Sequence, residues 1–156
     1  MSGLTIISGG QTGVDQAALD AARELEIPCG GYIPAGRWTE DGPLSSDYQG
    51  MVETESEGPS ARTKLNVREC DATLIITRGA CEGGTLLTAE TARKSGKRLL
   101  IIDLALLRPE VAILAILDWI EMAAPARLNV AGPRASKDPA IYAEAKAILL
   151  EVLRRA

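Results

Sequence analysis

Short runs of apolar residues alternate along the chain with longer segments in which apolar residues recur every three or four positions. The runs are typical of strands and the spaced segments are typical of helices. The predicted strands cover 4–7, 29–33, 73–77, 99–102 and 128–131. Two predicted helices cover 12–25 and 60–70. A third follows the turn at 79–85, and two more begin at Pro109 and at Asp138-Pro139. Between residues 34 and 59 no periodicity is visible, which predicts a long binding loop, a lid or a disordered segment.

The predicted strands are continuous apolar runs rather than alternating ones. Such strands are buried on both faces, as in a parallel sheet that is covered by helices on each side. The length of 156 residues suits one compact domain. We therefore expect an α/β protein, a single Rossmann-like three-layer domain over 1–156 with a mainly parallel sheet and a long loop at about 34–59.

Four polar segments, most of them rich in glycine, come directly after predicted strands. They are 9–13, 79–85, Asp103 and 132–136. The carboxyl ends of parallel strands lie at one edge of the sheet, where ligands of open α/β sheets bind. The pattern therefore predicts one ligand site at this edge.

The first of these segments lies in "SGGQTGVDQAALDAA", residues 8–22. A strand-glycine-helix junction offers backbone N–H groups and a positive helix end, which suit a phosphate or another oxyanion. The candidate residues are Gly9, Gly10, Gln11, Thr12 and Gly13. The spacing matches neither GxxxxGK[ST] nor GxGxxG, and without the lysine P-loop hydrolysis of ATP is not supported. A tight turn without a ligand is the alternative.

Three further groups of residues add to the candidate site. Gly83, Gly84 and Thr85 can hold a second phosphate at the start of the next helix. Arg62 and Asn66 share one helix face, which fits either an anion contact or a solvated surface. The last group brackets the end of the last strand and comprises Asn129, Gly132, Arg134 and Ser136. Arg134 is the strongest candidate for an anion contact.

Composition excludes several kinds of chemistry. The chain has no histidine, which removes Ser-His-Asp and Cys-His catalysis and histidine-ligated metal. A net charge of −4 does not favour nucleic acid or an anionic membrane as a partner. Three separated cysteines suit a reducing compartment and argue against a zinc site or a disulfide framework, so we expect a cytoplasmic protein with no metal ligands. We assign no catalytic residues, and any catalysis would have to use carboxylates, arginine, lysine, hydroxyls or the backbone.

The segment 111–120 is apolar almost all round. A helix of this kind is buried on more than one side. The second cover is either another subunit, which predicts a homo-oligomer such as a dimer or a tetramer, or a deep core within one chain.

Several of these motifs, taken in order, resemble the molybdenum carrier protein family. They are "SGGQTGVDQAALDAA", "Y-x-P-x-G-R…EDGP" (32–43), "R-T-x-x-N-V-x-x-x-D-A-T-L-I" (62–75), "GGT" (83–85) and "LNVAGPR-x-S" (128–136). That family looks like a branch of the Rossmann-like SLOG superfamily, which is related to lysine-decarboxylase-like proteins and phosphoribohydrolases.

This resemblance implies a homo-oligomeric carrier whose cargo is molybdenum cofactor, a small anionic ligand made of a phosphorylated pterin and molybdenum. It also implies that molybdoenzymes or cofactor-synthesis proteins are partners. The glycine loops and Arg134 would bind phosphate and oxo groups, and polar side chains would bind the pterin edge. The expectation of binding falls on Gly9, Gly10, Gln11, Thr12, Gly13, Gly83, Gly84, Thr85, Asn129 and Arg134.

Two rival functions use the same loops. Phosphoribohydrolases of the superfamily carry PGGxGTxxE, in which the glutamate follows the threonine by three residues. In this chain Glu90 follows Thr85 by five, and on a helix that shift turns a side chain by roughly half a turn. Glu90 therefore does not take over the catalytic role, and Asp15 or Asp103 would have to replace it in a hydrolase of nucleoside monophosphates. A sensor that binds a nucleotide or phosphate is the other alternative.

Overall fold

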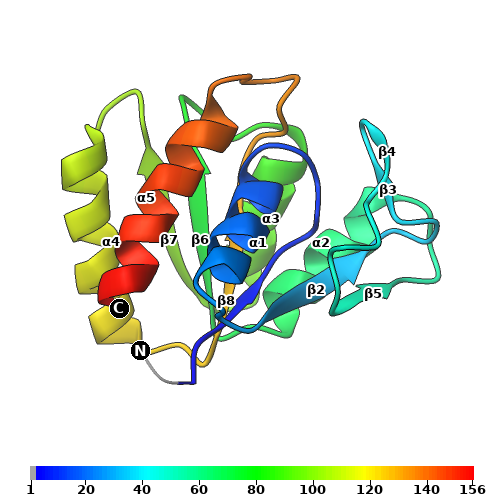
Figure 1. The fold of residues 1–156 in the computed structure, drawn as a ribbon, viewed down its shortest axis with the longest axis horizontal. Helices are drawn as coiled ribbons and strands as arrows, with labels where there is room; N and C mark the ends of the chain where they lie inside the picture. The colour runs from blue at the N-terminus through cyan, green and yellow to red at the C-terminus, as the bar shows by residue number, and fades with distance from the viewer. Residues whose placement is uncertain (1–2) are drawn as a thin grey trace.

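A parallel β-sheet forms the centre of the molecule, between two layers of helices (Figure 1). The structure is a computed structural model and describes residues 3–156. Within these residues the main sheet has six strands in the order β5-β2-β1-β8-β6-β7, and all neighbouring strands run parallel. The strands are β1 (Thr5–Ile7), β2 (Cys29–Ile33), β5 (Met51–Glu53), β6 (Ala72–Thr77), β7 (Arg98–Asp103) and β8 (Arg127–Ala131). The predicted Rossmann-like α/β fold is confirmed.

Five helices in the described part of the chain cover the sheet. They are α1 (Val14–Glu24), α2 (Pro59–Arg68), α3 (Gly83–Lys94), α4 (Pro109–Ala123) and α5 (Ile141–Arg155). Helix α5 packs between α1 and α4, and α2 packs against α3 (Figure 1). Helices α1, α4 and α5 lie on one face of the sheet, and α2 and α3 lie on the opposite face.

The order of the strands places the last one, β8, between β1 and β6. The chain runs from β1 outward to β2 and β5, and then crosses to β6 and β7 on the other side. A reversal of strand order of this kind leaves a crevice at the carboxyl ends of the central strands. The loops after β1, β6 and β8 therefore meet, as the sequence predicts.

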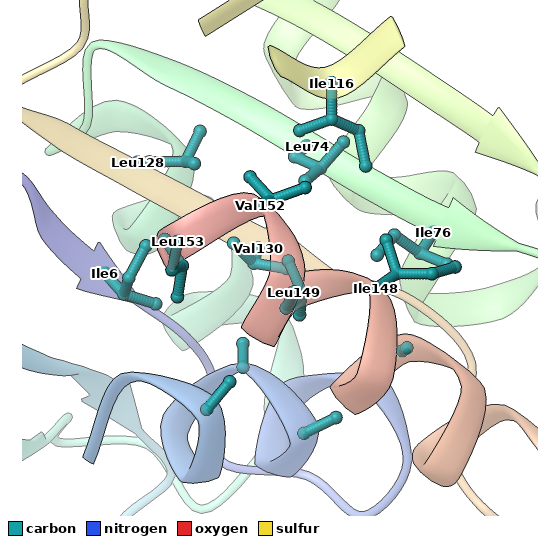
Figure 2. Close-up of a cluster of buried hydrophobic side chains, with 14 of the residues drawn as sticks. Ile6, Leu74, Ile76, Ile116, Leu128, Val130, Ile148, Leu149, Val152 and Leu153 are labelled. Atoms are coloured by element: carbon teal, nitrogen blue, oxygen red, sulfur yellow. The ribbon is translucent and has the colours of Figure 1, made fainter. Parts of the chain in front are cut away.

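The face covered by α1, α4 and α5 carries the main hydrophobic core. Figure 2 shows strand residues such as Ile6, Leu74, Ile76 and Val130 pointing toward the helices on this face. Alternate residues of each strand point to opposite faces. The neighbours of these residues along the strands, such as Asn129 and Thr73, are therefore buried on the α2–α3 face.

The segment from 34 to 58 contains regular structure that the sequence did not predict. Strands β3 (Trp38–Thr39) and β4 (Gly42–Pro43) form an antiparallel hairpin, and β5 adds a parallel edge strand next to β2. These strands are too short for an apolar period to be visible, because a pattern of period two needs about four residues.

Two predicted helix starts are also corrected. Helix α2 begins at Pro59 after Gly58, one residue before the predicted start at residue 60. Helix α5 begins at Ile141. Asp138 accepts a hydrogen bond from Ala140 N–H at 3.2 Å, and this bond belongs to a turn before the helix.

Helix α4 is buried on one side within the single chain. Ala112, Ile116, Trp119 and Ile120 face the core, whereas Leu114 is 58% exposed and Met122 is 66% exposed. The second cover expected for this helix is therefore not supplied by the chain itself. Within residues 3–156 no helix has the length and apolar character needed to cross a membrane.

Candidate functional site

A cavity of about 660 Å³ lies at the carboxyl ends of β1, β8 and β6. Its wall is built by the loop after β1, one side of α2, the β6–α3 loop with the start of α3, and the segment after β8. Most of the predicted site residues line it: Gly9, Gln11, Arg62, Asn66, Gly83, Gly84, Thr85, Asn129, Gly132 and Arg134. The other four, Gly10, Thr12, Gly13 and Ser136, are not part of its lining.

The loop after β1 does not offer the open anion cradle that its glycines predict. The amides of Gly10, Gln11 and Thr12 donate hydrogen bonds to side chains of the same loop and of α1. Val14 N–H, in the first turn of α1, donates to Pro133 O at 3.2 Å. The segment after β8 therefore closes the start of this helix, and the expectation of free amides there is corrected.

The glycines of this loop allow close packing between segments of the chain. A Cβ atom on Gly9 would lie 1.9 Å from Nη1 of Arg62, and one on Gly13 would lie 2.2 Å from Pro133 O. Gly10 has a φ of +74°, which side chains rarely adopt. These residues are glycines for a structural reason, whether or not a ligand is bound nearby.

The group that occupies the expected anion position is a carboxylate of the protein itself. Glu40, at the turn of the β3–β4 hairpin, accepts hydrogen bonds of 2.5 Å from the hydroxyls of Thr12 and Ser136. Arg134 Nε lies 3.1 Å from Oε1 of Glu40. Burial alone would raise the pKa of Glu40, but the bonds from Ser136 and Thr12 outweigh it and lower the pKa. Thr12, Arg134 and Ser136, which were predicted to bind an anion, thus bind the carboxylate of Glu40.

The start of α3, in contrast, is open. A Cβ atom on Gly83 or Gly84 would meet nothing within 4 Å. Within residues 3–156 the backbone amides of these two glycines donate no hydrogen bond. Thr85 also lines the cavity in the first turn. Unpaired amides and the positive end of a helix dipole at one place attract an anion.

Helix α2 brings the second positive group into the cavity. Arg62 is 9% exposed, and its Nη1 donates to Gly9 O at 2.7 Å and lies 3.3 Å from Oδ2 of Asp15. Its Nε donates to Pro59 O at 3.1 Å. Nη2 has no partner among residues 3–156, so it remains available to a ligand.

Asp15, the partner of Arg62, is the site residue that sequence reasoning weighed only as a substitute catalyst. It is 5% exposed and lines the cavity from the first turn of α1. Burial raises its pKa to about 6, although the charge of Arg62 and the hydrogen bond from Gln11 N–H both lower it. A signal was present in the sequence, because Asp15 shares a helix face with the buried Ala18 and Ala22.

The two asparagines of the predicted site are partly used in holding the fold. Asn66 exchanges hydrogen bonds with the backbone of Tyr32 in β2, through Oδ1 at 2.8 Å and Nδ2 at 3.1 Å. Asn129 Nδ2 donates to Thr73 Oγ1 at 3.3 Å. A Cβ atom on Gly132 would lie 2.2 Å from Ile76 O, so this glycine also serves close packing.

Two other carboxylates considered for catalysis lie outside the cavity. Glu90 is exposed on α3 and is not part of the lining. Asp103 accepts hydrogen bonds from the amides of Gly79 at 2.8 Å and Ala105 at 2.9 Å, and so holds the β6–α3 loop. These two amide bonds lower the pKa of Asp103.

Arg78 and Lys137 are basic side chains at the rim of the cavity, and only Lys137 is without an ion-pair partner in residues 3–156. Arg78 pairs with Asp138 at 2.9 Å and also with Glu144. Lys137 lines the cavity, and its ammonium forms no ion pair within residues 3–156. The same residues contain no cluster of three or more histidine, cysteine, aspartate or glutamate side chains that could hold a metal ion. The unpaired cations and amides of the cavity therefore favour an anion.

Comparisons with known proteins agree with the resemblance seen in the ordered motifs. Residues 6–153 match the circularly permutated YpsA SLOG family. A crystal structure from Syntrophus aciditrophicus SB, described as a "putative molybdenum carrier protein", is 45% identical to this chain with a TM-score of 0.91. The match covers 95% of this chain and 92% of that one. No curated protein matches the chain. The chain belongs to the circularly permutated YpsA SLOG family.

Proposed function

We propose that this protein binds molybdenum cofactor in the cavity and stores it or passes it on without chemical change. The observation that carries the proposal is that the open start of α3 and the buried Arg62 lie in one cavity. A phosphorylated ring compound fits a wall that combines positive groups with amides and hydroxyls. The description of the similar crystal structure supports this choice of cargo.

The phosphate binds at the start of α3 in this proposal. The amides of Gly83 and Gly84 donate to its oxygens, and Lys137 at the rim adds a positive charge. The cradle of Thr12, Arg134 and Ser136 already holds the carboxylate of Glu40. A second anion there would have to displace that carboxylate, so the α3 start is the favoured place.

The first experiment measures the ligand that accompanies the protein through purification. The protein is produced in a host that makes molybdenum cofactor, purified without oxygen and denatured. We expect molybdenum and pterin to be released in equal amounts. A nucleotide released without molybdenum would contradict the carrier function and favour the nucleotide sensor or the hydrolase.

A single substitution at the start of α3 tests the location. Gly84→Asp places a carboxylate in the open space where the phosphate is proposed to bind, so we expect molybdenum and pterin to be lost from the purified protein. Gly84→Asn has nearly the same shape without the charge and should retain more of both. If Gly84→Asp retains as much as the unchanged protein, the phosphate does not bind at this helix.

We further propose that two copies of the chain associate through α4 and that the protein acts in the cytoplasm, with molybdoenzymes or cofactor-synthesis proteins as partners. The exposed apolar residues of α4 and of the turn before it support the first point: Leu106, Val111, Leu114 and Met122. Sedimentation equilibrium tests it, because Leu114→Glu should convert a dimer to a monomer. A monomeric parent protein would contradict it.

A further inference from the structure

The cavity contains a hydrogen-bond acceptor and a donor side by side, each with an unused atom. Asp15 accepts from Arg62 Nη1 and from Gln11 N–H through Oδ2, at 3.3 Å and 3.2 Å. Its Oδ1 has no hydrogen-bond partner within residues 3–156, and Arg62 Nη2 has none either. Both side chains line the cavity and are about nine-tenths buried.

The contacts behind these two atoms hold the pair in place before any ligand arrives. Arg62 is held through Nε by Pro59 O at 3.1 Å and through Nη1 by Gly9 O at 2.7 Å. Ser8 Oγ donates to the backbone carbonyl of Asp15 at 2.8 Å. A buried pair with fixed geometry loses little freedom when a ligand binds, which favours specific recognition.

A ligand that satisfies both free atoms must donate to a carboxylate and accept from a guanidinium at neighbouring positions. A phosphate does not fit, because its oxygens would face the carboxylate of Asp15. The edge of a 2-amino-4-oxopyrimidine ring does fit, because its amino group and ring N–H donate and its carbonyl oxygen accepts. This edge occurs in pterins and in guanine.

We propose that Asp15 and Arg62 recognise the 2-amino-4-oxo edge of a pterin or guanine ring, Asp15 through its free carboxylate oxygen and Arg62 through Nη2. This inference rests on the proposed function, because it uses the same cavity, and it assigns the ring to a different wall from the phosphate. Gly83 and Gly84 hold the phosphate, and the buried pair selects the ring.

A holding role alone does not account for the pair. Gln11 N–H and Arg62 both bind Oδ2 of Asp15, so the holding role uses one carboxylate oxygen and leaves the other without a partner in residues 3–156. Burial makes the charge of Asp15 costly in the ligand-free protein and so raises its pKa to about 6. Hydrogen bonds from a ring would stabilise that charge.

Calorimetric titration of the unchanged protein with defined phosphates tests the inference without any variant. The probes are neopterin monophosphate, GMP, IMP, AMP and ribose 5-phosphate. IMP lacks the amino group and should bind about tenfold more weakly than GMP. AMP offers neither donor and lacks the carbonyl, so it should bind about a hundredfold or more weakly than GMP. Equal affinities for GMP and AMP would overturn the inference.

The same titration distinguishes the sources of the ring. Tighter binding of neopterin monophosphate than of GMP identifies a pterin, and the reverse order identifies a guanine nucleotide. Both orders support recognition of the shared edge. If ribose 5-phosphate binds as tightly as GMP, the ring is not recognised, yet the phosphate site of the proposed function stands. If none of the five compounds binds, both proposals fail.

Asp15→Asn then tests the assignment to the carboxylate. Asparagine keeps the shape but replaces one acceptor with a donor, so the preference for GMP over AMP should disappear while ribose 5-phosphate binds as before. Glu90→Gln is the matched control, because it removes a carboxylate outside the cavity and should keep the full preference. A preference that survives in Asp15→Asn would overturn the role of Asp15.

Discussion

The two faces of the central sheet are both covered by helices, but only one of them buries many polar side chains. The face under α1, α4 and α5 is packed with isoleucine, leucine, valine and alanine (Figure 2). The face under α2 and α3 also buries apolar residues such as Ile75 and Val67, but it adds threonines, asparagines and the Asp15–Arg62 pair, and the cavity opens there. Alternate residues of each strand point to opposite faces, so neighbouring residues of one strand contribute to the apolar core and to the polar face in turn.

This difference separates stability from binding within one small fold. Apolar burial contributes about 25 cal/mol for each Å² removed from water, so the apolar face supplies most of the stabilisation. Polar groups that line a cavity contribute less to folding and remain available to a ligand. Substitutions on the two faces should therefore affect different measurements.

The largest effect is expected from a truncation on the apolar face. Ile76→Ala should lower the free energy of unfolding by about 2–5 kcal/mol, because Ile76 is fully buried and its removal leaves a cavity. Denaturant titration measures this change. Ligand release after purification should be unaltered in the folded fraction. A loss below about 1 kcal/mol would show that this face is not the main source of stability.

The next effect concerns pH and the buried pair on the polar face. The pKa of Asp15 rises from 3.8 to about 6 on folding, so between pH 4 and pH 6 the folded state binds more protons than the unfolded state. Stability from this group is therefore lost as pH rises through that window, by up to about 3 kcal/mol.

Asp15→Asn removes this titration. The free energy of unfolding of the variant, relative to that of the unchanged protein, should therefore be higher at pH 7 than at pH 4. Denaturant titration of both proteins at these two pH values measures the difference. A difference that does not depend on pH would show that the folded protein leaves the pKa of Asp15 near its usual value. The charge of Arg62 lowers the pKa of Asp15, so Arg62→Gln should raise this pKa and extend the pH dependence of stability to higher pH.

A smaller effect is expected at the hairpin that closes the polar side. Glu40→Gln keeps the shape but removes the charge that accepts from Thr12, Ser136 and Arg134, and should cost about 1 kcal/mol. The change should be local, and hydrogen exchange should show faster exchange at the amides of Glu40 and Ser136. Unchanged exchange there would mean that the hairpin is held by other contacts.

The smallest effect on stability is expected from Gly84→Asp, which should change stability and ligand binding in opposite directions. Gly84 lies in the first turn of α3 with a negative φ and open space around it, and an aspartate there interacts well with the helix dipole. Gly84→Asp should therefore raise the free energy of unfolding by about 0.5–1 kcal/mol while it abolishes binding of the phosphate. Thermal unfolding measures the gain. A strong destabilisation would make the loss of ligand uninformative.

The strands and the edge that carries the site follow from local patterns. The apolar runs identified five of the six strands of the main sheet, and their continuity indicated that the sheet is parallel. The loops after β1, β6 and β8 meet because all these strands run in the same direction. The β3–β4 hairpin and β5 escaped prediction, because strands of two or three residues have no visible period.

The choice of residues within the site was harder to predict. Arg134 was favoured by its place beside a strand end, yet it pairs with Glu40 from a hairpin that no sequence pattern indicated. Arg62 was ambiguous between a surface and a site, and its burial depends on contacts with Gly9 and Asp15. Glycines at α1 and at α3 look alike in the sequence, although those at α1 serve packing and those at α3 face open space.

By itself the sequence determined the layered α/β fold, the parallel direction of the strands and the edge at which polar loops converge, because each depends on local periodicity and on glycine placement. The tertiary structure alone decided which helix start is open, where Glu40 binds, and that Asp15 and Arg62 form a buried pair across 47 positions of the chain. These properties arise where distant segments meet. Whether a polar group is satisfied depends on which partner lies within about 3 Å, and no local pattern records that.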